Sequence, residues 1–186
     1  ENFMISCMTH GADGNGADIE QLRQCGVSLD DAAYLVAFVV PYRDAGQWGM
    51  VEFEQLKLSI RQRLADLLRL DELEHYGSML HDGLVFVIKE RGSDFDRRVD
   101  AAFNRMAMTT GQFLSVPIHI GVSTMHRGFQ DLSLAWEEAA AALSLGRMGG
   151  SGVVSYAGQT GRTQTGQTGK LLAEGELAAI EYAMKF

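Results

Sequence analysis

The chain has 186 residues, a formal net charge of -8 and a pI near 5.1. This length suits one domain with appendages, and 46% hydrophobic with 22% charged residues indicates a globular protein with a packed core. An acidic chain without a basic stripe lacks the positive surface that grips phosphates, which excludes direct nucleic-acid binding by this part of the protein. No apolar run approaches the roughly 20 residues that span a bilayer, so we expect no membrane contact by this part either.

Composition divides the chain into four stretches. Residues 1–32 combine helical apolar spacing with a glycine-rich loop and are predicted to be a helical lead-in, and residues 33–157 are predicted to be the folded domain. Residues 158–169 are rich in glycine, threonine and glutamine and cannot bury enough apolar surface to fold, which predicts a flexible linker. Residues 170–186 restart a helical pattern that the chain end truncates, so we expect the sequence to be a piece of a longer protein.

The cysteine usage indicates a reducing compartment. Cys7 and Cys25 stand in neither a CxxC motif nor a metal-ligand spacing, so we expect two reduced thiols. No signal peptide is visible. We therefore expect a cytoplasmic location, with the cytosolic part of a membrane-anchored protein as the variant of that expectation.

The first predicted elements surround a strongly apolar strand. A short helix ends at Gly26, and a nearly unbroken apolar run from Ala33 to Val40 predicts a central strand covered on both faces. Pro41 ends this strand because proline has no ladder donor. A long amphipathic helix follows, with apolar residues at three- and four-residue steps and charged residues between them. The apolar residues are Phe53, Leu56, Ile60, Leu64, Leu67 and Leu68, and the charged ones are Glu54, Lys57, Arg61 and Arg63.

Two further strands form a predicted hairpin. The first runs from Tyr76 to Leu80 and the second from Leu84 to Lys89, with His81-Asp82-Gly83 between them. An Asp-Gly pair flanked by apolar runs is a strong hairpin signal, since both residues tolerate a positive φ.

Four elements complete the predicted domain. A helix begins at Ser93, with Asp96 as its capping partner, and a strand follows from Val116 to Ser123. Another helix starts near Asp131, and Val153 to Tyr156 makes a last short strand.

The order of elements predicts the fold class. Strand, helix, strand, strand, helix, strand is the split βαβ arrangement of ferredoxin-like and nucleotide-cyclase-like palms, here extended by a C-terminal helix and strand. We expect an α+β domain with both long helices on one face of the sheet. Two right-handed crossovers are expected to place parallel neighbours in mid-sheet.

Three short motifs resemble the C-terminal half of GGDEF domains. They are the strand Ile118–Ser123, the helix Trp136–Leu143 and the closing strand Val153–Tyr156. The Glu-Ala-x-x-Ala-Leu core at 138–143 resembles more closely the GGDEF-like domains of AraC-type transcription regulators and of CdaR/PucR-type sugar-diacid regulators. This resemblance implies the GGDEF-like version of the palm fold for residues 33–157.

The N-terminal stretch is similar to the AraC-type relatives. These begin with a helix containing Asn-Phe, followed by a variable loop, a helix ending in glycine, and the first strand. Asn2-Phe3, the loop Gly11–Gly16, the segment Gln21–Gly26 and the strand from Tyr34 follow this plan. The resemblance covers roughly residues 1–157.

The resemblance also allows a test for cyclase activity. A diguanylate cyclase needs a Gly-Gly-Asp/Glu-Glu-Phe hairpin, whose glycines admit the nucleotide and whose acidic residue binds metal. In this chain the glycines are replaced by Leu80 and His81, and the second acidic position is Gly83. Asp82 alone matches, and we interpret it as a turn residue favoured for positive φ.

The second metal-binding aspartate of a cyclase would lie at the end of the first strand. This chain has Pro41-Tyr42-Arg43 there, and Asp44 lies three residues past the strand end. Phosphoryl transfer depends on metal ions and positioned charges. We therefore predict that the chain is not an enzyme and has no catalytic, cofactor-binding or metal-binding residues, with Leu80, His81, Asp82 and Gly83 as vestigial hairpin positions.

Other candidate sites give no further chemistry. The five histidines form neither an HxxxH nor an HExxH motif, and His119 is expected to be a surface or partly buried structural residue. Gly149-Gly150-Ser151-Gly152 has no lysine and is interpreted as a turn, not a phosphate loop.

The resemblance implies a non-catalytic regulatory domain of an AraC-type bacterial regulator. Its partners would be the neighbouring domains of the same chain, an upstream sensor and a downstream helix-turn-helix domain, with a second copy as a further expectation. The domain would transmit a signal through packing or dimerisation. The alternative is a degenerate receptor that binds a nucleotide or small metabolite without turnover.

Overall fold

The central strand of the sheet is built from the apolar run expected at Ala33–Val40. In the computed structural model, β1 spans Ala33–Pro41 and all nine of its residues are buried. It pairs with β3 along one edge and with β4 along the other. Pro41 still faces Ile118 in the second ladder, and the next amide, that of Tyr42, donates to the carbonyl of Pro117 at 2.8 Å.

The structure describes residues 5, 16–24, 26–29, 32–42, 48–90, 92, 94–149 and 152–156. The helices among them are α2 (Gly16–Gln24), α3 (Met50–Leu70), α4 (Phe95–Phe113), the short 3-10 helix η1 (Phe129–Asp131) and α5 (Leu132–Gly149). The strands are β1, β2 (His75–Met79), β3 (Leu84–Lys89), β4 (Ile118–Val122), β5 (His126–Arg127) and β6 (Gly152–Ser155). The predicted linker, the truncated helix and Ser93 lie outside the described residues.

The strand order is β2-β3-β1-β4-β6, with β5 pairing separately with β1. This confirms the α+β palm, but the expectation of parallel neighbours in mid-sheet is wrong. Each pair among β2, β3, β1 and β4 is antiparallel, and the described parallel pair is β4 with β6. The physical reason is that the α3 crossover skips over β3 and the α4 crossover skips over β1, so the strands that each helix joins are not neighbours.

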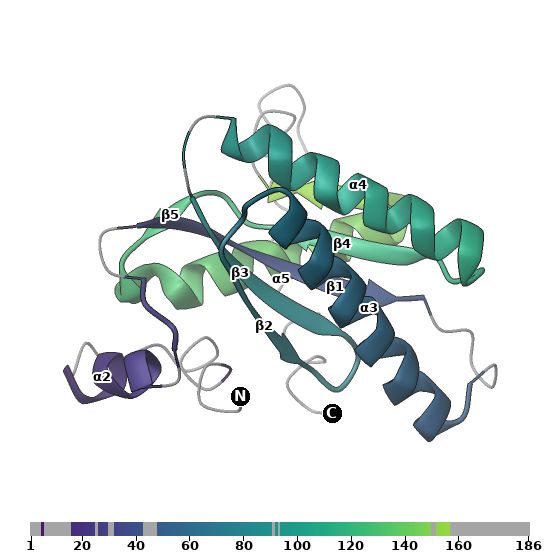
Figure 1. Ribbon diagram of the computed structural model, residues 1–186, viewed down its shortest axis with the longest axis horizontal. Coiled ribbons are helices and arrows are strands. Elements are labelled where there is room, and N and C mark those ends of the chain that lie inside the picture. Colours follow the sequence, from purple (N-terminus) through teal and green to yellow (C-terminus); the bar gives the residue numbers. More distant parts are fainter. Residues whose placement is uncertain are drawn as a thin grey trace, which may run out of the picture.

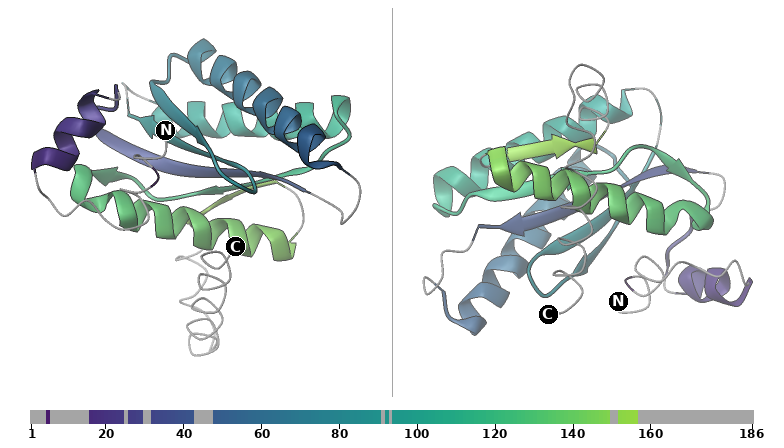
Figure 2. Two further views of the ribbon diagram at one scale, coloured as in Figure 1. Left: turned by 90° about the horizontal axis from the view of Figure 1, so that it is seen from below. Right: turned by 180° about the vertical axis from the view of Figure 1, so that it is seen from behind.

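Helices cover both faces of the sheet, and the result is three layers (Figures 1 and 2). The two long helices α3 and α4 share one face, as expected, and bury a core with Ile60, Leu64 and Phe103 fully enclosed. The opposite face packs against α5, with Phe38 and Trp136 in edge-to-face contact at 4.4 Å between ring centroids. The α2 side adds Leu22 to this second core, and Gly26 at φ 82° ends α2 as predicted.

The packing of α5 depends on a glycine in β4. A Cβ at Gly121 would lie 2.4 Å from the carbonyl oxygen of Ala139 and 2.4 Å from the amide nitrogen of Leu143. Both atoms belong to the backbone of α5, which cannot rotate away as a side chain can. Gly121 therefore sets how closely α5 approaches the sheet.

Gly121→Ala should lower the free energy of unfolding by about 1–3 kcal/mol, because α5 must move away from β4. Urea unfolding followed by circular dichroism measures this loss. The matched control is Gly111→Ala in α4, where an added Cβ meets nothing within 4 Å. That helical substitution should leave stability unchanged or raise it by up to about 1 kcal/mol. Equal effects of the two substitutions would contradict the packing argument.

Candidate functional site

The vestigial hairpin positions meet the end of β1 at one corner of the sheet. We call this the hairpin corner and define it as the turn Leu80–Gly83, the strand end Val39–Tyr42, and Lys57 of α3. Leu80 donates its amide to the carbonyl of Gly83 at 2.9 Å, which closes the turn. The pairing of Val39 with Leu84 brings the turn beside β1.

The turn is not built as the sequence suggested. Neither Asp82 nor Gly83 has a positive φ, so the interpretation of Asp82 as a positive-φ turn residue is wrong. Gly83 is required for space instead, because a Cβ there would lie 2.5 Å from the carbonyl oxygen of Val39. The His81 and Asp82 side chains project into solvent, 82% and 78% exposed, with 3.7 Å between the His81 Nε2 and the Asp82 Oδ1.

Lys57 holds the turn against α3. Its side chain is 2% exposed, and its ammonium donates to the carbonyls of Leu80 at 2.7 Å and His81 at 2.8 Å. The third partner is the Glu54 carboxylate at 2.7 Å, and the Phe53 ring centroid lies 5.3 Å away. Because an ammonium has three donors, these acceptors occupy all of them.

The assignment of Lys57 to the polar side of its helix is therefore wrong. Position 57 follows Phe53 by four residues and precedes Ile60 by three, so it belongs to the apolar stripe that the sequence itself displays. The helical spacing would have located this buried cation before the structure did. Lys57 was assigned to the exposed side only because lysine is usually exposed.

The strand end of the corner carries an aromatic pair. His119, opposite Val40 in the ladder, is 6% exposed, so it is more deeply buried than the expected surface or partly buried position. Its ring lies 6.0 Å from that of Tyr42 between centroids. Arg43 and Asp44, the other positions considered at this strand end, lie outside the described residues.

Among the residues that the structure describes, no three or more His, Cys, Asp and Glu side chains form a group that could hold a metal ion. No described helix is long and apolar enough to cross a membrane. Where the sequence comparison placed the nucleotide hairpin, the structure has the turn Leu80–Gly83 bonded to Lys57 of α3.

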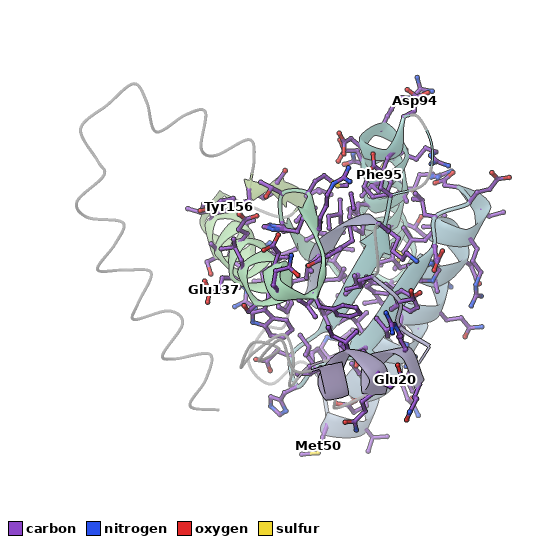
Figure 3. The ribbon with its side chains drawn as sticks, turned by 90° about the vertical axis from the view of Figure 1, so that its left-hand side faces the viewer. Glu20, Met50, Asp94, Phe95, Glu137 and Tyr156 are labelled. Atoms are coloured by element: carbon purple, nitrogen blue, oxygen red, sulfur yellow. The ribbon has the colours of Figure 1, made fainter. Side chains whose placement is uncertain are left out.

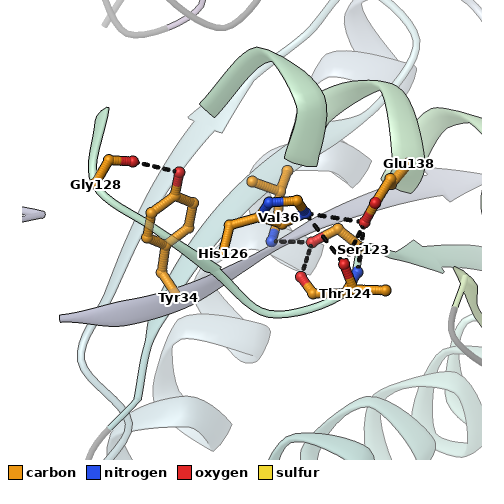
Figure 4. Close-up of polar contacts among 7 residues, drawn as sticks. All are labelled: Tyr34, Val36, Ser123, Thr124, His126, Gly128 and Glu138. Atoms are coloured by element: carbon orange, nitrogen blue, oxygen red, sulfur yellow. Dashed lines mark hydrogen bonds and ion pairs between the residues drawn. The ribbon is translucent and has the colours of Figure 1, made fainter. Parts of the chain in front are cut away.

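Sequence reasoning missed a second polar group, which we call the Glu138 cluster: Tyr34, Ser123, Thr124, His126 and Glu138 (Figure 4). One oxygen of Glu138 in α5, Oε2, accepts hydrogen bonds from the Thr124 amide at 2.8 Å and hydroxyl at 2.6 Å. The same oxygen lies 2.9 Å from the His126 Nε2. The signal was available, because Glu138 shares its helix face with the buried Ala135 and Ala142.

The carboxylate of Glu138 is stabilised in its charged form. Burial by itself would raise its pKa, but the hydrogen bonds from Thr124 and His126 outweigh that effect and hold the pKa below the ordinary value of 4.5. A lowered pKa contributes stability above the unfolded value, and this stability is lost as the pH falls through the folded value.

Lys57→Met should cost about 2–4 kcal/mol of unfolding free energy, because it leaves two carbonyls in the corner without their donor. Lys89→Met is the matched control at the other end of the same hairpin, where Lys89 is 13% exposed and pairs with Glu74. We expect a smaller loss there, since that ammonium donates to the Glu74 carboxylate at 3.0 Å and not to main-chain carbonyls of the turn. A larger loss at Lys89 in urea titrations would contradict the role given to Lys57.

Glu138→Gln should remove a pH-dependent part of the stability. The difference from the unchanged protein is expected to be full above pH 4.5 and to shrink as the pH falls below it, since protonation abolishes the charge in both cases. Urea midpoints measured from pH 7 to pH 3 give this profile. Glu137→Gln, at the exposed neighbouring position, should show no such trend, and a pH-independent loss at Glu138 would refute the assignment.

Two solved structures resemble this fold. The GGDEF domain of DgcB from Caulobacter crescentus in complex with c-di-GMP has a TM-score of 0.49 at 11% identity, covering 74% of this chain and 83% of that one. The coiled coil and GGDEF domain of the same DgcB in complex with c-di-GMP has a TM-score of 0.47 at 11% identity, covering 74% of each chain. No curated protein matches the sequence.

Residues 11–145 match the family described as GGDEF-like domain, which is well over half of the chain. This match contradicts the prediction that the chain is not an enzyme, because membership of a GGDEF-like family points to the cyclase fold. The substitutions at Leu80, His81 and Gly83 do not by themselves exclude turnover. The resemblance stated from the sequence is confirmed at the level of the domain: the chain belongs to the family of GGDEF-like domains.

Proposed function

We propose that this GGDEF-like domain is a regulatory, signal-transmitting domain of a bacterial transcription regulator of the AraC type. It acts through packing against neighbouring domains of its own chain or against a second copy, in the cytoplasm. The observation that carries the proposal is the junction at Lys57, which joins α3, the hairpin turn and the end of β1.

The junction supports transmission because its bonds are made to main chain. Lys57 holds the carbonyls of Leu80 and His81, so a shift of α3 must move the turn whatever side chains the turn carries. Gly83 in turn packs against the backbone of Val39. A displacement that enters at α3 therefore reaches the central strand through contacts that are short and buried.

The surface of α3 offers a place for such a displacement to enter. Met50 is 80% exposed, Val51 69% and Leu58 50%, and all three are apolar side chains of this helix. Met50 projects from one end of the molecule (Figure 3). Apolar side chains concentrated on one element are typical of contact surfaces.

The net charge of -8 supports the proposal that a different domain of the parent protein contacts DNA. An acidic domain repels the phosphate backbone, so DNA contact would come from a separate helix-turn-helix domain.

In the intact regulator, Lys57→Met should reduce the ratio of reporter expression with and without the inducing signal by about tenfold or more. Glu54→Gln keeps both carbonyl bonds and removes only the ion pair, so it should give a smaller reduction in a fully folded protein. Lys89→Met, at the opposite end of the hairpin, should respond normally. Reporter output with expression matched by immunoblotting measures all three, and unchanged induction in Lys57→Met would overturn the proposal.

The alternative function, a receptor for a nucleotide or small metabolite, is tested by ligand binding. We expect no change in melting temperature of the domain with millimolar GTP, c-di-GMP or sugar diacids in the presence of Mg²⁺. A dose-dependent rise that follows RT ln(1 + [L]/Kd) would favour a receptor for that ligand. Formation of c-di-GMP from GTP would establish a cyclase, and an operator-specific gel shift by this chain alone would contradict the assignment of DNA contact to a different domain.

A further inference from the structure

The first residues of β1 are held by an unusually short strand. β5 consists of His126 and Arg127 and pairs with Tyr34 and Ala33. A two-residue strand contributes few ladder hydrogen bonds, so its position depends on side chains. The Glu138 cluster supplies those side chains.

Polar contacts fix both ends of this strand (Figure 4). Before it, Glu138 Oε2 accepts the Thr124 amide and hydroxyl, and it lies 2.9 Å from the His126 Nε2. After it, the Tyr34 hydroxyl donates to the carbonyl of Gly128 at 2.8 Å. His126 is 8% exposed and the Glu138 side chain 14%, so water competes little for these bonds.

The remainder of β1 is bonded to Ser123 of the cluster, which accepts the Val36 amide at 2.9 Å, but it has no bond to Glu138 and keeps ladders of its own. Residues Tyr34–Val39 pair with β3, and residues Ala37–Pro41 pair with β4. Loss of the Glu138 contacts would therefore free residues 124–128 and loosen α5, while the central ladders and the bonds between Ser123 and Val36 stay intact. Local opening of this kind is the behaviour expected of a segment with few ladder bonds.

Residues 26–29, which follow α2, lie against the same region. Leu22, Val27 and Leu29 belong to the apolar core that contains Tyr34 and also includes Phe129 and Leu132. The Ser28 amide donates to the Tyr76 hydroxyl at 3.4 Å, which attaches this segment to the hairpin as well. A displacement of residues 26–29 would therefore disturb η1 and the beginning of α5, because these segments share one apolar core.

We propose that the Glu138 cluster is a mechanical latch, which clamps residues 124–128 and α5 to the beginning of β1 and opens when residues 26–29 are displaced. This inference rests on the proposed function, because it names the route by which a domain preceding α2 reaches α5. Although burial acts to raise it, the pKa of Glu138 is also kept below its ordinary value by the hydrogen bonds from Thr124 and His126, so the carboxylate that makes these contacts is charged at neutral pH.

Amide hydrogen exchange of the whole chain at pH 7 tests the latch. Glu138→Gln should accelerate exchange in residues 124–128 by about tenfold or more, while Val85–Val87 in β3 change less than about threefold. Glu137→Gln is the matched control, because Glu137 lies on the outer side of α5 and is exposed (Figure 3). It should exchange like the unchanged protein.

A second, milder variant tests the latch in case Glu138→Gln does not fold. Thr124→Val keeps the shape of the side chain and removes the 2.6 Å hydroxyl bond to Glu138, so it should accelerate the same segment to a smaller degree. Unchanged exchange in residues 124–128 of both variants would overturn the latch. Equal acceleration in β3 would do so too, because the cluster would then only support the global fold.

A third variant tests whether α2 is coupled to residues 124–128. Leu22→Ala removes a fully buried side chain from α2 and should accelerate exchange in residues 124–128 more than in β3. Parallel acceleration of both segments, or none in residues 124–128, would refute the route through the lead-in. These exchange rates are measured on the chain alone, so their failure is distinguishable from a failure of the reporter test at Lys57.

Discussion

Burial of β1 on both faces and along both edges is the constraint on which the rest of the domain depends. A strand with nine buried residues must have partners for every backbone group, since an unpaired buried amide or carbonyl is costly. β3 and β4 supply the ladders, β5 completes the first two positions, and the helical layers cover the faces. The crossovers through α3 and α4 then have to skip a strand, which fixes the antiparallel order.

Two charged groups, the buried Lys57 and the partly buried Glu138, lie at opposite ends of this strand, and each joins a helix to it. Lys57 connects α3 to the hairpin turn beside the end of β1, and Glu138 connects α5 to the loop beside its beginning. Both use main-chain partners, so the helices on the two faces are positioned by the backbone itself. A helix that shifts on one face can in this way alter the strand that both faces share, which is the physical basis of the signal-transmitting role that we propose.

The position of the GGDEF hairpin shows why motif comparison alone was insufficient. The substituted residues Leu80, His81 and Gly83 led to the prediction that the chain is not an enzyme, and the family to which it belongs contradicts that prediction. What the structure adds is the content of the corner: the Gly83 backbone packed on Val39, and an ammonium saturated by three acceptors. These contacts show how the turn is held in place. The absence of the motif residues gives no information about that.

The sequence by itself determined the long helices, the strands other than β5, their order and the palm fold, because apolar periodicity records which face of each element is buried. It did not determine which strands are neighbours, that β5 exists, or that Lys57 is buried and Glu138 partly buried, since these depend on partners distant in the chain. Glu138 meets Thr124 and His126 only after the β4–α5 turn is made, and Lys57 meets Leu80 only after the hairpin folds back. Tertiary structure decided these contacts because a buried charge is stable only where other segments bring its hydrogen-bond partners.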